Sequence, residues 1–236
     1  MTMRRVLITG AGQGLGLEWA RQALADGARV VATARRPKES EGLLALAQGA
    51  PAGRLSVLPM DVTDDASVDA AAGAVAAEVG ALDELVNNAG TYGPRGDHAL
   101  AAAPDEVRRI LEVNTVGPYR VTRAFLALLK EGSAARVVFI TSKMGSIGDA
   151  PGGAAYAYRM SKSALNMLGA NLASDLRGDG IISVILHPGW VKTRMGGDRA
   201  PVAMPDSVAG MRSLAARATL AESGKFFDYS GAPVPW

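Results

Sequence analysis

Cysteine is absent from this chain of 236 residues. The protein therefore cannot be a disulfide-stapled scaffold, hold zinc through thiolates or use a catalytic cysteine. Histidine is almost as scarce, because only His98 and His187 occur and no Glu or Cys partner pattern surrounds them. The sequence thus predicts no metal site.

Long apolar runs are also missing. No stretch approaches the ~20 residues of a membrane span, and no hydrophobic leader precedes the first expected strand. The chain also has no strong excess of positive or negative charge, since its 25 Lys and Arg nearly balance its 23 Asp and Glu, for a net charge of +2. These charges are scattered, so we expect a cytoplasmic protein with no nucleic-acid or membrane partner.

Short apolar runs alternate with segments of helical spacing along the whole chain. This pattern predicts an α/β fold, a doubly wound parallel Rossmann-type sheet with helices on both faces. The expected strands cover 5–9, 28–34, 55–60, 84–87, 137–142, 181–187 and 225–229, and the expected helices 15–26, 66–79, 104–130, 156–177 and 206–219. No linker or repeat divides the sequence, so residues 1–236 are predicted to form a single domain, long enough to bury a core without metals or disulfides.

Glycines punctuate the first strand-to-helix turn. They follow Thr9 in the pattern T-G-x-x-x-G-x-G, at Gly10, Gly14 and Gly16. A strand, a glycine turn and a helix form the first half of a dinucleotide-binding unit, in which N–H groups at the helix N-terminus hold the diphosphate. A P-loop is excluded, because no Lys-Ser or Lys-Thr follows the glycines. The alternative is a tight turn that binds nothing.

A tyrosine and a lysine, Tyr158 and Lys162, lie four residues apart in an expected helix. This spacing places the phenol and the ammonium on one helix face. An ammonium beside a phenol favours the phenolate, so we expect a lowered pKa for Tyr158. Such a tyrosine can exchange a proton near neutral pH, as carbonyl–alcohol chemistry requires. The spacing alone is common in ordinary helices.

Polar and glycine residues also follow the predicted strands. Ligands of a doubly wound sheet bind outside the carboxyl ends of its strands. The positions that follow the first six strands are Gly10, Arg35, Asp61, Asn87 to Gly90, Ser142 and Pro188-Gly189. Their placement on one rim favours a functional site there.

The ordered set of motifs resembles the short-chain dehydrogenase/reductase family over essentially the whole chain. The set comprises Thr9-Gly10-x-x-x-Gly14-x-Gly16, Asn87-Asn88-Ala89-Gly90, Asn114, Ser142, Tyr158-x-x-x-Lys162 and Pro188-Gly189. Residues 156–166, the segment His187 to Thr193, Phe226 to Tyr229 and the final Pro235-Trp236 are similar to the C-factor and sniffer-type carbonyl reductase branch. The resemblance implies an oxidoreductase with a nicotinamide cofactor, a small carbonyl substrate and a homodimer or homotetramer.

The resemblance also implies roles for individual residues. Ser142 would hydrogen-bond the substrate carbonyl, Tyr158 would donate the proton, and Lys162 would bind the nicotinamide ribose. Asn114 would connect Lys162 to a proton-supplying water chain. The implied cofactor contacts are Gly10, Gln13, Gly14, Leu15, Gly16, Arg35, Asp61, Val62, Asn87, Ala89, Gly90, Tyr158, Lys162, Pro188, Gly189, Val191 and Thr193.

Several of these residues have simpler explanations. Asp61 could cap the following helix, Asn114 could be a buried helix amide, and Pro188-Gly189 could be an ordinary turn. Fifteen residues separate Ser142 from Tyr158, slightly more than in many family members, so Ser146 is the fallback serine. Tyr156 has Met160 four residues on, which makes it a pocket or packing residue.

The end of the second strand decides the expected cofactor. An NAD-specific site places an acid there, and in this chain that position holds Ala34. Arg35 and Arg36 follow and suit a phosphate dianion, so we expect NADPH or NADP+ to be preferred and NADH to bind less well. Two observations oppose a preference for NADPH. The two arginines could form a solvated turn, and Gln13 occupies the position where some NADP-type members of the family carry Lys or Arg.

Three functions fit these residues. The first is an NADPH-dependent carbonyl reductase; the others are an NAD-dependent alcohol dehydrogenase and a C-factor-like signalling or nucleotide-sensing protein. Specificity loops are expected at 91–98, 143–155 and 190–204, the last as a mobile lid, but they do not identify the substrate. An oligomer is expected because helices 104–130 and 156–177 carry apolar residues on more than one face, as at Phe125, Leu128, Leu129, Leu165, Leu168 and Leu172.

Overall fold

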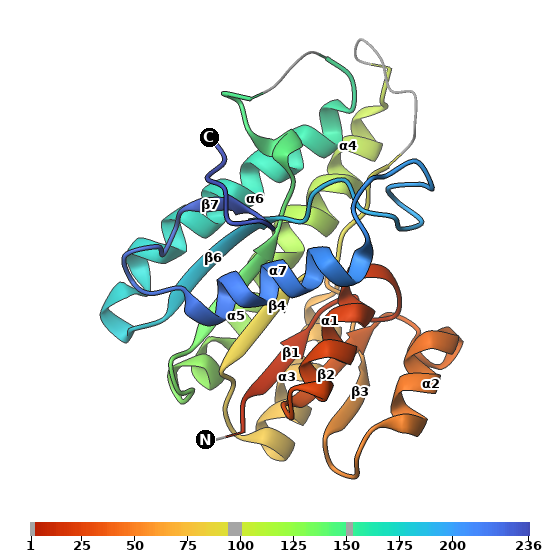
Figure 1. The fold of residues 1–236 in the computed structure, drawn as a ribbon, viewed down its shortest axis with the longest axis vertical. Helices are drawn as coiled ribbons and strands as arrows, with labels where there is room; N and C mark the ends of the chain where they lie inside the picture. The colour runs from red at the N-terminus through yellow and green to blue at the C-terminus, as the bar shows by residue number, and fades with distance from the viewer. Residues whose placement is uncertain (1–2, 94–100, 150–152) are drawn as a thin grey trace.

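Residues 3–93, 101–149 and 153–236 are described by the computed structural model. Within them, seven strands form one parallel sheet in the order β3-β2-β1-β4-β5-β6-β7 (Figure 1). The strands are β1 (Arg5–Ile8), β2 (Arg29–Ala34), β3 (Leu55–Pro59), β4 (Glu84–Asn87), β5 (Arg136–Ile140), β6 (Ile182–His187) and β7 (Phe226–Asp228). The strand order reverses between β1 and β4, which confirms the predicted doubly wound sheet.

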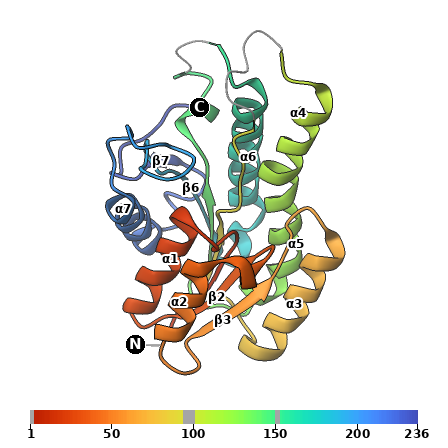
Figure 2. The same ribbon diagram turned by 90° about the vertical axis from the view of Figure 1, so that its right-hand side faces the viewer.

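Helices connect successive strands. They are α1 (Gly14–Ala25), α2 (Glu41–Gly49), α3 (Asp65–Val79), α4 (Pro104–Leu111), α5 (Gly117–Lys130), α6 (Tyr156–Asp175) and α7 (Met204–Arg217), with shorter turns η1 (Pro37–Glu39), η2 (Glu112–Val116), η3 (Lys143–Gly145) and η4 (Arg177–Asp179). Figure 2 shows α1 and α7 on one side of the sheet and α3, α5 and α6 on the other.

Alternation along the strands divides the core between these two layers. In β1, Val6 and Ile8 belong to the cluster that includes Trp19 of α1, whereas Leu7 belongs to the cluster that includes Phe125 of α5. Successive strand residues point to opposite faces, so an all-apolar strand serves two helical layers at once. This arrangement explains why the strands appear as continuous apolar runs in the sequence.

Helix α2 was not predicted. Ser40 caps it, accepting a hydrogen bond from the Leu43 backbone N–H, and Leu43 is the only residue of this helix that is fully buried. A helix of nine residues with one buried position gives a weak periodic pattern.

The single helix expected over 104–130 is interrupted. The π-helical turn η2 separates α4 from α5 and carries the fully buried Asn114. Wide turns of this kind often occur at functional sites. Gly117 and Pro118 follow η2 directly, and Pro118 has no N–H to donate to the Asn114 carbonyl, so this pair is the sequence signal that the prediction of a continuous helix overlooked.

The apolar residues that were noted on more than one face of helices 104–130 and 156–177 lie against the core of this chain. Phe125, Leu128, Leu129 and Leu165 belong to the core beneath the sheet, and Leu168 and Leu172 pack against it. These residues therefore serve the core of a single chain, and the expected oligomer stays a prediction. The large apolar side chains that α6 and the η2–α5 region do expose are Val116, Tyr119, Met160 and Met167.

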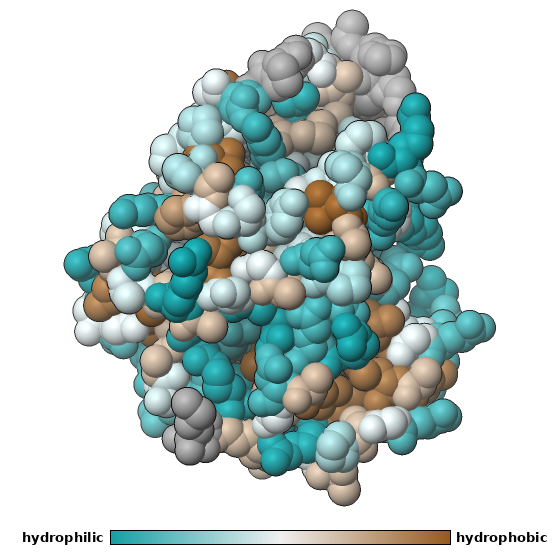
Figure 3. Space-filling model, in the orientation of Figure 1, coloured by the Kyte–Doolittle hydropathy of each residue, from teal (hydrophilic) through white to brown (hydrophobic). Residues whose placement is uncertain are grey.

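The outer surface mixes polar and apolar groups. On the face in Figure 3, apolar side chains gather where α1 and α2 meet, beside a pocket of about 240 Å³ lined by Leu17 and Leu46. Among the described residues, no helix has the length and apolar character needed to cross a bilayer.

Candidate active site

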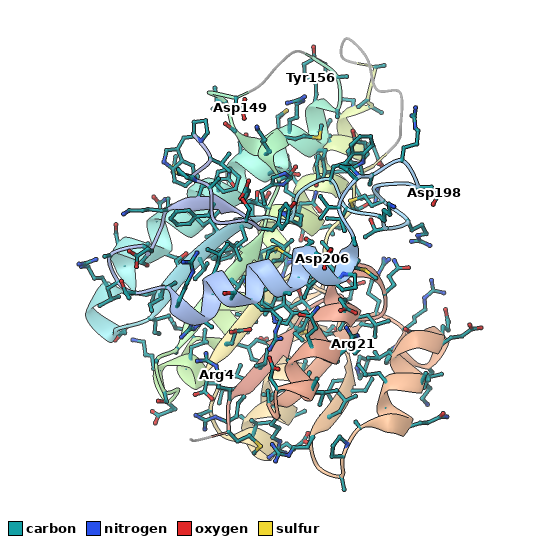
Figure 4. All side chains as sticks on the ribbon, in the orientation of Figure 1. Arg4, Arg21, Asp149, Tyr156, Asp198 and Asp206 are labelled. Carbon is teal, nitrogen blue, oxygen red and sulfur yellow. The ribbon has the colours of Figure 1, made fainter. Side chains whose placement is uncertain are left out.

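The candidate residues gather at the carboxyl edge of the sheet, as predicted from the sequence. Figure 4 shows Asp149 and Tyr156, which follow β5, at the opposite end of the molecule from Arg4, which precedes β1. Segments at the carboxyl ends of β1 to β6, the first turn of α1 and the first turns of α6 supply the candidate residues, and η2 supplies Asn114.

The glycine turn after β1 is locked to the turn after β4. Gly10 has φ +64°, and a Cβ there would lie 2.9 Å from the Cα of Ala89, so only glycine permits this approach. The Thr9 hydroxyl accepts hydrogen bonds from the backbone N–H groups of Asn88 (3.0 Å) and Ala89 (2.9 Å). In return, the Asn88 side chain donates to the carbonyls of Thr9 (2.8 Å) and Gly10 (3.1 Å). The motif N-N-A-G was noted in the sequence, but this locking role of Asn88 was missed.

The N-terminus of α1 opens on this turn. Gln13, the residue before the helix, has extended backbone and provides no side-chain cap, and the first turn contains no acid. The N–H groups of the first helical turn, which begins with Gly14, Leu15 and Gly16, therefore lack a side-chain partner. This is the arrangement that binds an anionic phosphate.

Arg35 is exposed directly after β2. Arg36 forms an ion pair with Glu39 at 2.9 Å, whereas Arg35 has no ion pair with any described residue. The neighbouring Ser40 hydroxyl donates a hydrogen bond to the Gly12 carbonyl, which ties the start of α2 to the glycine turn. The free guanidinium thus belongs to the same local surface as the helix N-terminus.

Asp61 and Val62 follow β3. The Asp61 carboxylate accepts hydrogen bonds from the Thr63 backbone N–H (3.0 Å) and hydroxyl (2.7 Å). Helix α3 is capped instead by Asp64, so the helix-cap alternative for Asp61 is wrong. Val62 is buried, and its carbonyl accepts a hydrogen bond from Arg120 at 2.6 Å.

Asn87 leaves a buried acceptor at the end of β4. Its Nδ2 donates to the Thr122 hydroxyl at 3.0 Å, while its Oδ1 has no hydrogen-bond partner among the described residues. Buried polar atoms are nearly always paired, so this oxygen suits a ligand donor. Ala89 and Gly90 follow, and Gly90 borders both Asn114 and Lys162.

Asn114 joins two elements of the site. Its Oδ1 accepts from the Thr91 N–H, and its Nδ2 donates to the Thr91 carbonyl, each at 2.8 Å. The same Nδ2 donates to the Ser161 hydroxyl of α6 at 2.9 Å. The buried amide therefore fixes the turn after β4 relative to α6. The predicted connection from Asn114 to a water chain stays a prediction.

Tyr158 lies among three polar or aromatic side chains. Its phenol hydrogen-bonds Ser142, and the Lys162 Nζ lies 5.7 Å from its ring centroid. Lys162 in turn donates to the Ile140 carbonyl at 2.9 Å. The fallback Ser146 instead accepts from the Asp149 N–H within its own loop, so the geometry favours Ser142. The Tyr92 ring, whose contact was not predicted, lies 4.6 Å from that of Tyr158, centroid to centroid.

Burial dominates the acid–base properties of this pair. It raises the pKa of Tyr158 to about 12, against the opposing effect of the Ser142 hydrogen bond. It also lowers the pKa of Lys162 from its ordinary 10.5 to about 8. The expectation of a lowered tyrosine pKa was wrong in direction, because the phenol is withdrawn from water. At neutral pH Tyr158 is thus protonated, and a pKa of about 12 makes its hydroxyl a weaker acid than that of an ordinary tyrosine.

The segment after β6 is braced internally. The Pro188 carbonyl accepts from the Ser207 hydroxyl at 2.6 Å, and Gly189 packs beside Tyr229. Val191 is buried and forms an isolated bridge with Val202, while the Thr193 hydroxyl accepts from the Gly196 N–H. These contacts fold the segment after β6 back on itself at the carboxyl edge of the sheet. The contacts predicted between its residues and a cofactor stay predictions.

Parts of the expected specificity loops, 94–98 and 150–152, and with them His98, lie outside the described residues. Burial lowers the pKa of the remaining histidine, His187, to about 4. Within the described ranges, no group of three or more His, Asp or Glu side chains could hold a metal ion.

Known proteins resemble this chain in both sequence and fold. The short chain dehydrogenase family model matches residues 4–202. The chain is 46% identical over 160 residues to C-signal of Myxococcus xanthus, covering 66% of this chain and 94% of that protein. It superposes with a TM-score of 0.93 on NADPH-bound carbonyl reductase from chicken fatty liver (35% identity) and on carbonyl reductase Sniffer of D. melanogaster (32% identity), with full coverage of all three chains.

Proposed function

Because this chain belongs to the short-chain dehydrogenase/reductase family, in its C-factor and sniffer-type branch, we propose that it is an NADPH-dependent reductase of aldehyde or ketone carbonyls, with Tyr158 as the proton donor. The family makes it an NAD(P)-dependent oxidoreductase that acts on small molecules. The finer statement depends above all on one observation, the buried phenol of Tyr158 with Lys162 Nζ 5.7 Å from its ring centroid and the buried Ser142 as its hydrogen-bond partner.

The geometry supports separate roles for the side chains. Tyr158 would donate its hydroxyl proton to the carbonyl oxygen, while Ser142 would hydrogen-bond that oxygen and hold it in line. Lys162, over the face of the Tyr158 ring, would supply positive charge as negative charge develops on the tyrosine oxygen. Burial excludes water from the pair, which strengthens both effects.

The residues present fit a nicotinamide dinucleotide. The uncapped N-terminus of α1, the close approach at Gly10 and the unpaired Oδ1 of Asn87 offer a diphosphate cradle and a buried acceptor. The predicted holding residues are the seventeen cofactor contacts given from the sequence. When bound, NADPH supplies the hydride that reduces the carbonyl carbon.

NADPH is expected to be preferred over NADH because Arg35 is free to contact the 2′-phosphate. Replacing Arg35 with Asp should weaken NADPH binding by roughly 1.5–3 kcal/mol, about one to two decades in Kd, and leave NADH binding unchanged or improved. Fluorescence titration of both cofactors measures this difference.

Arg36→Asp is the matched control for this substitution. Its guanidinium already pairs with Glu39, so a smaller loss of NADPH affinity is expected. Equal losses of NADPH and NADH affinity in Arg35→Asp, or tighter NADH binding by the wild type, would contradict the assigned preference.

Two other functions stay open to the same experiment. An alcohol dehydrogenase would use this site in the oxidative direction with NAD+. The similarity to C-signal favours a signalling or nucleotide-sensing protein as the second candidate. NADPH oxidation followed by absorbance against aldehydes, ketones, quinones and diketones separates them. Turnover of any carbonyl supports the reductase, whereas cofactor binding without turnover in either direction supports the sensor.

A homodimer or homotetramer is proposed as the working form, and a cytoplasmic location stays a prediction. The exposed side chains Tyr119, Met160 and Met167 offer an apolar face on α5 and α6. Light scattering at micromolar concentration should give the mass of two or four chains, and Met167→Glu should lower it. A wild-type mass of one chain would remove this proposal.

A further inference from the structure

We propose that Tyr92 is a positioning residue, whose ring holds the phenol of Tyr158 in the orientation from which it donates its proton. This inference builds on the proposed function. The two ring centroids are 4.6 Å apart, and the ring planes are tilted by 36°. These values correspond to direct contact between aromatic rings. Lys162 lies over the ring of Tyr158 at 5.7 Å, so Tyr92 adds a second restraint on that ring.

The backbone beside Tyr92 is fixed to the helix that carries Tyr158. Both polar backbone groups of Thr91 are bound by the Asn114 amide, which also donates to the Ser161 hydroxyl. The Ser161 hydroxyl donates to the Tyr158 carbonyl at 2.7 Å. Tyr92 is thus connected to Tyr158 in two ways: by direct ring contact, and through hydrogen bonds that run from the Thr91 backbone to Asn114, Ser161 and the Tyr158 carbonyl.

The residue after Tyr92 is fixed as well. Gly93 has φ +85°, and a Cβ there would lie 2.3 Å from the Cδ1 of Ile110, which is fully buried in α4. The short segment 91–93 is therefore hydrogen-bonded by Asn114 at Thr91, and at Gly93 it leaves no room for a side chain beside Ile110. A side chain mounted on so constrained a backbone can restrain its neighbour.

Loss of the Tyr92 ring should have two separate consequences. The phenol of Tyr158 would gain rotational freedom, and small misplacement of a reacting group lowers the rate steeply. It would also gain access to water, which favours its ionised form. Since Tyr92 donates no proton in this proposal, its hydroxyl is dispensable and its ring is not.

The test compares Tyr92→Leu and Tyr92→Met with Tyr92→Phe, using the variants that circular dichroism shows to be folded. The non-aromatic variants should lower kcat by about 10- to 100-fold for aromatic and aliphatic carbonyls alike, with the Kd for NADPH unchanged. Tyr92→Phe should keep kcat close to the wild-type value. Tyrosinate absorbance, corrected with the same substitutions in a Tyr158→Phe background, should show that Tyr158 ionises at lower pH in the non-aromatic variants.

Three results would overturn the proposal: unchanged kcat in both non-aromatic variants, a change confined to the KM of aromatic carbonyls, or equal damage by phenylalanine. The first would show that the ring does not position Tyr158, the second that it only lines the pocket, and the third that its hydroxyl matters. If the wild type turned over no carbonyl, the proposed function would fail, while the absorbance titration would still decide whether Tyr92 controls Tyr158.

Discussion

Tyr158→Phe is expected to lower kcat by about 100- to 10 000-fold, because it removes the general acid and leaves the rest of the site in place. The phenylalanine ring can keep the contact with Tyr92, so the local packing should survive. The Kd for NADPH should stay nearly unchanged, since the hydroxyl proton serves the carbonyl oxygen. Steady-state kinetics and fluorescence titration measure the two quantities.

Tyr119→Phe is the control for this substitution. Tyr119 is about half exposed on α5, and its hydroxyl has no role in the proposed chemistry. This variant should therefore turn over carbonyls at the wild-type rate. If Tyr158→Phe kept more than about a tenth of the wild-type rate, Tyr158 would not be the proton donor.

Lys162→Met is expected to abolish most turnover and, at the same time, to stabilise the fold. Burial lowers the lysine pKa from 10.5 to about 8, so folding disfavours the ammonium that the unfolded chain carries. At pH 7 this penalty is about 3 kcal/mol, from which about 1 kcal/mol is subtracted for the lost hydrogen bond to Ile140. A net gain of about 2 kcal/mol in the free energy of unfolding is therefore expected.

The pH dependence gives this prediction a definite sign. Between about pH 8 and 10.5 the unfolded chain binds more protons at Lys162 than the folded chain does, so the free energy of unfolding rises with pH there. Lys162→Met should lack that contribution to the rise. Urea denaturation at several pH values measures it, with activity assayed in parallel.

Lys130→Met provides the comparison for Lys162→Met. Lys130 pairs with Asp179 on the surface at 2.9 Å, and its removal should change the free energy of unfolding by less than about 1 kcal/mol. If Lys162→Met were destabilised at pH 7 and remained active, Lys162 would be an ordinary structural lysine.

Much of the fold was predictable because the signals were local. The apolar runs predicted all seven strands, of which the central ones are buried and β3 and β7 at the sheet edges are partly exposed. The glycine pattern after β1 predicted a tight turn, and Gly10 has the positive φ that such a turn requires. The parallel sheet then required the strand ends to meet at one edge, which predicted that Gly10, Asn87 and Ser142 lie on one rim, while the pairing of Ser142 with Tyr158 came from the family resemblance.

The features that escaped prediction depend on contacts between distant segments. Asn88 matters because its side chain donates to the carbonyls of Thr9 and Gly10. Tyr92 matters because its ring contacts that of Tyr158, and the backbone of the preceding Thr91 is hydrogen-bonded by Asn114. The π turn that carries Asn114 had a local signal in Gly117-Pro118, but the apolar pattern on either side of it favoured one continuous helix. The pKa of Tyr158 was predicted in the wrong direction for the same reason, since spacing reveals a nearby ammonium but not the burial that outweighs it.

Transfer of a labelled hydride tests the central claim most directly. The wild type is incubated with a carbonyl that it turns over and with NADPH carrying deuterium at the transferable position of the nicotinamide ring. Mass spectrometry of the product should find one deuterium on the new carbinol carbon, with formation slowed about 100-fold or more in Tyr158→Phe. Oxidation of NADPH without deuterium in the alcohol, or equal rates in the two proteins, would contradict reduction at this site.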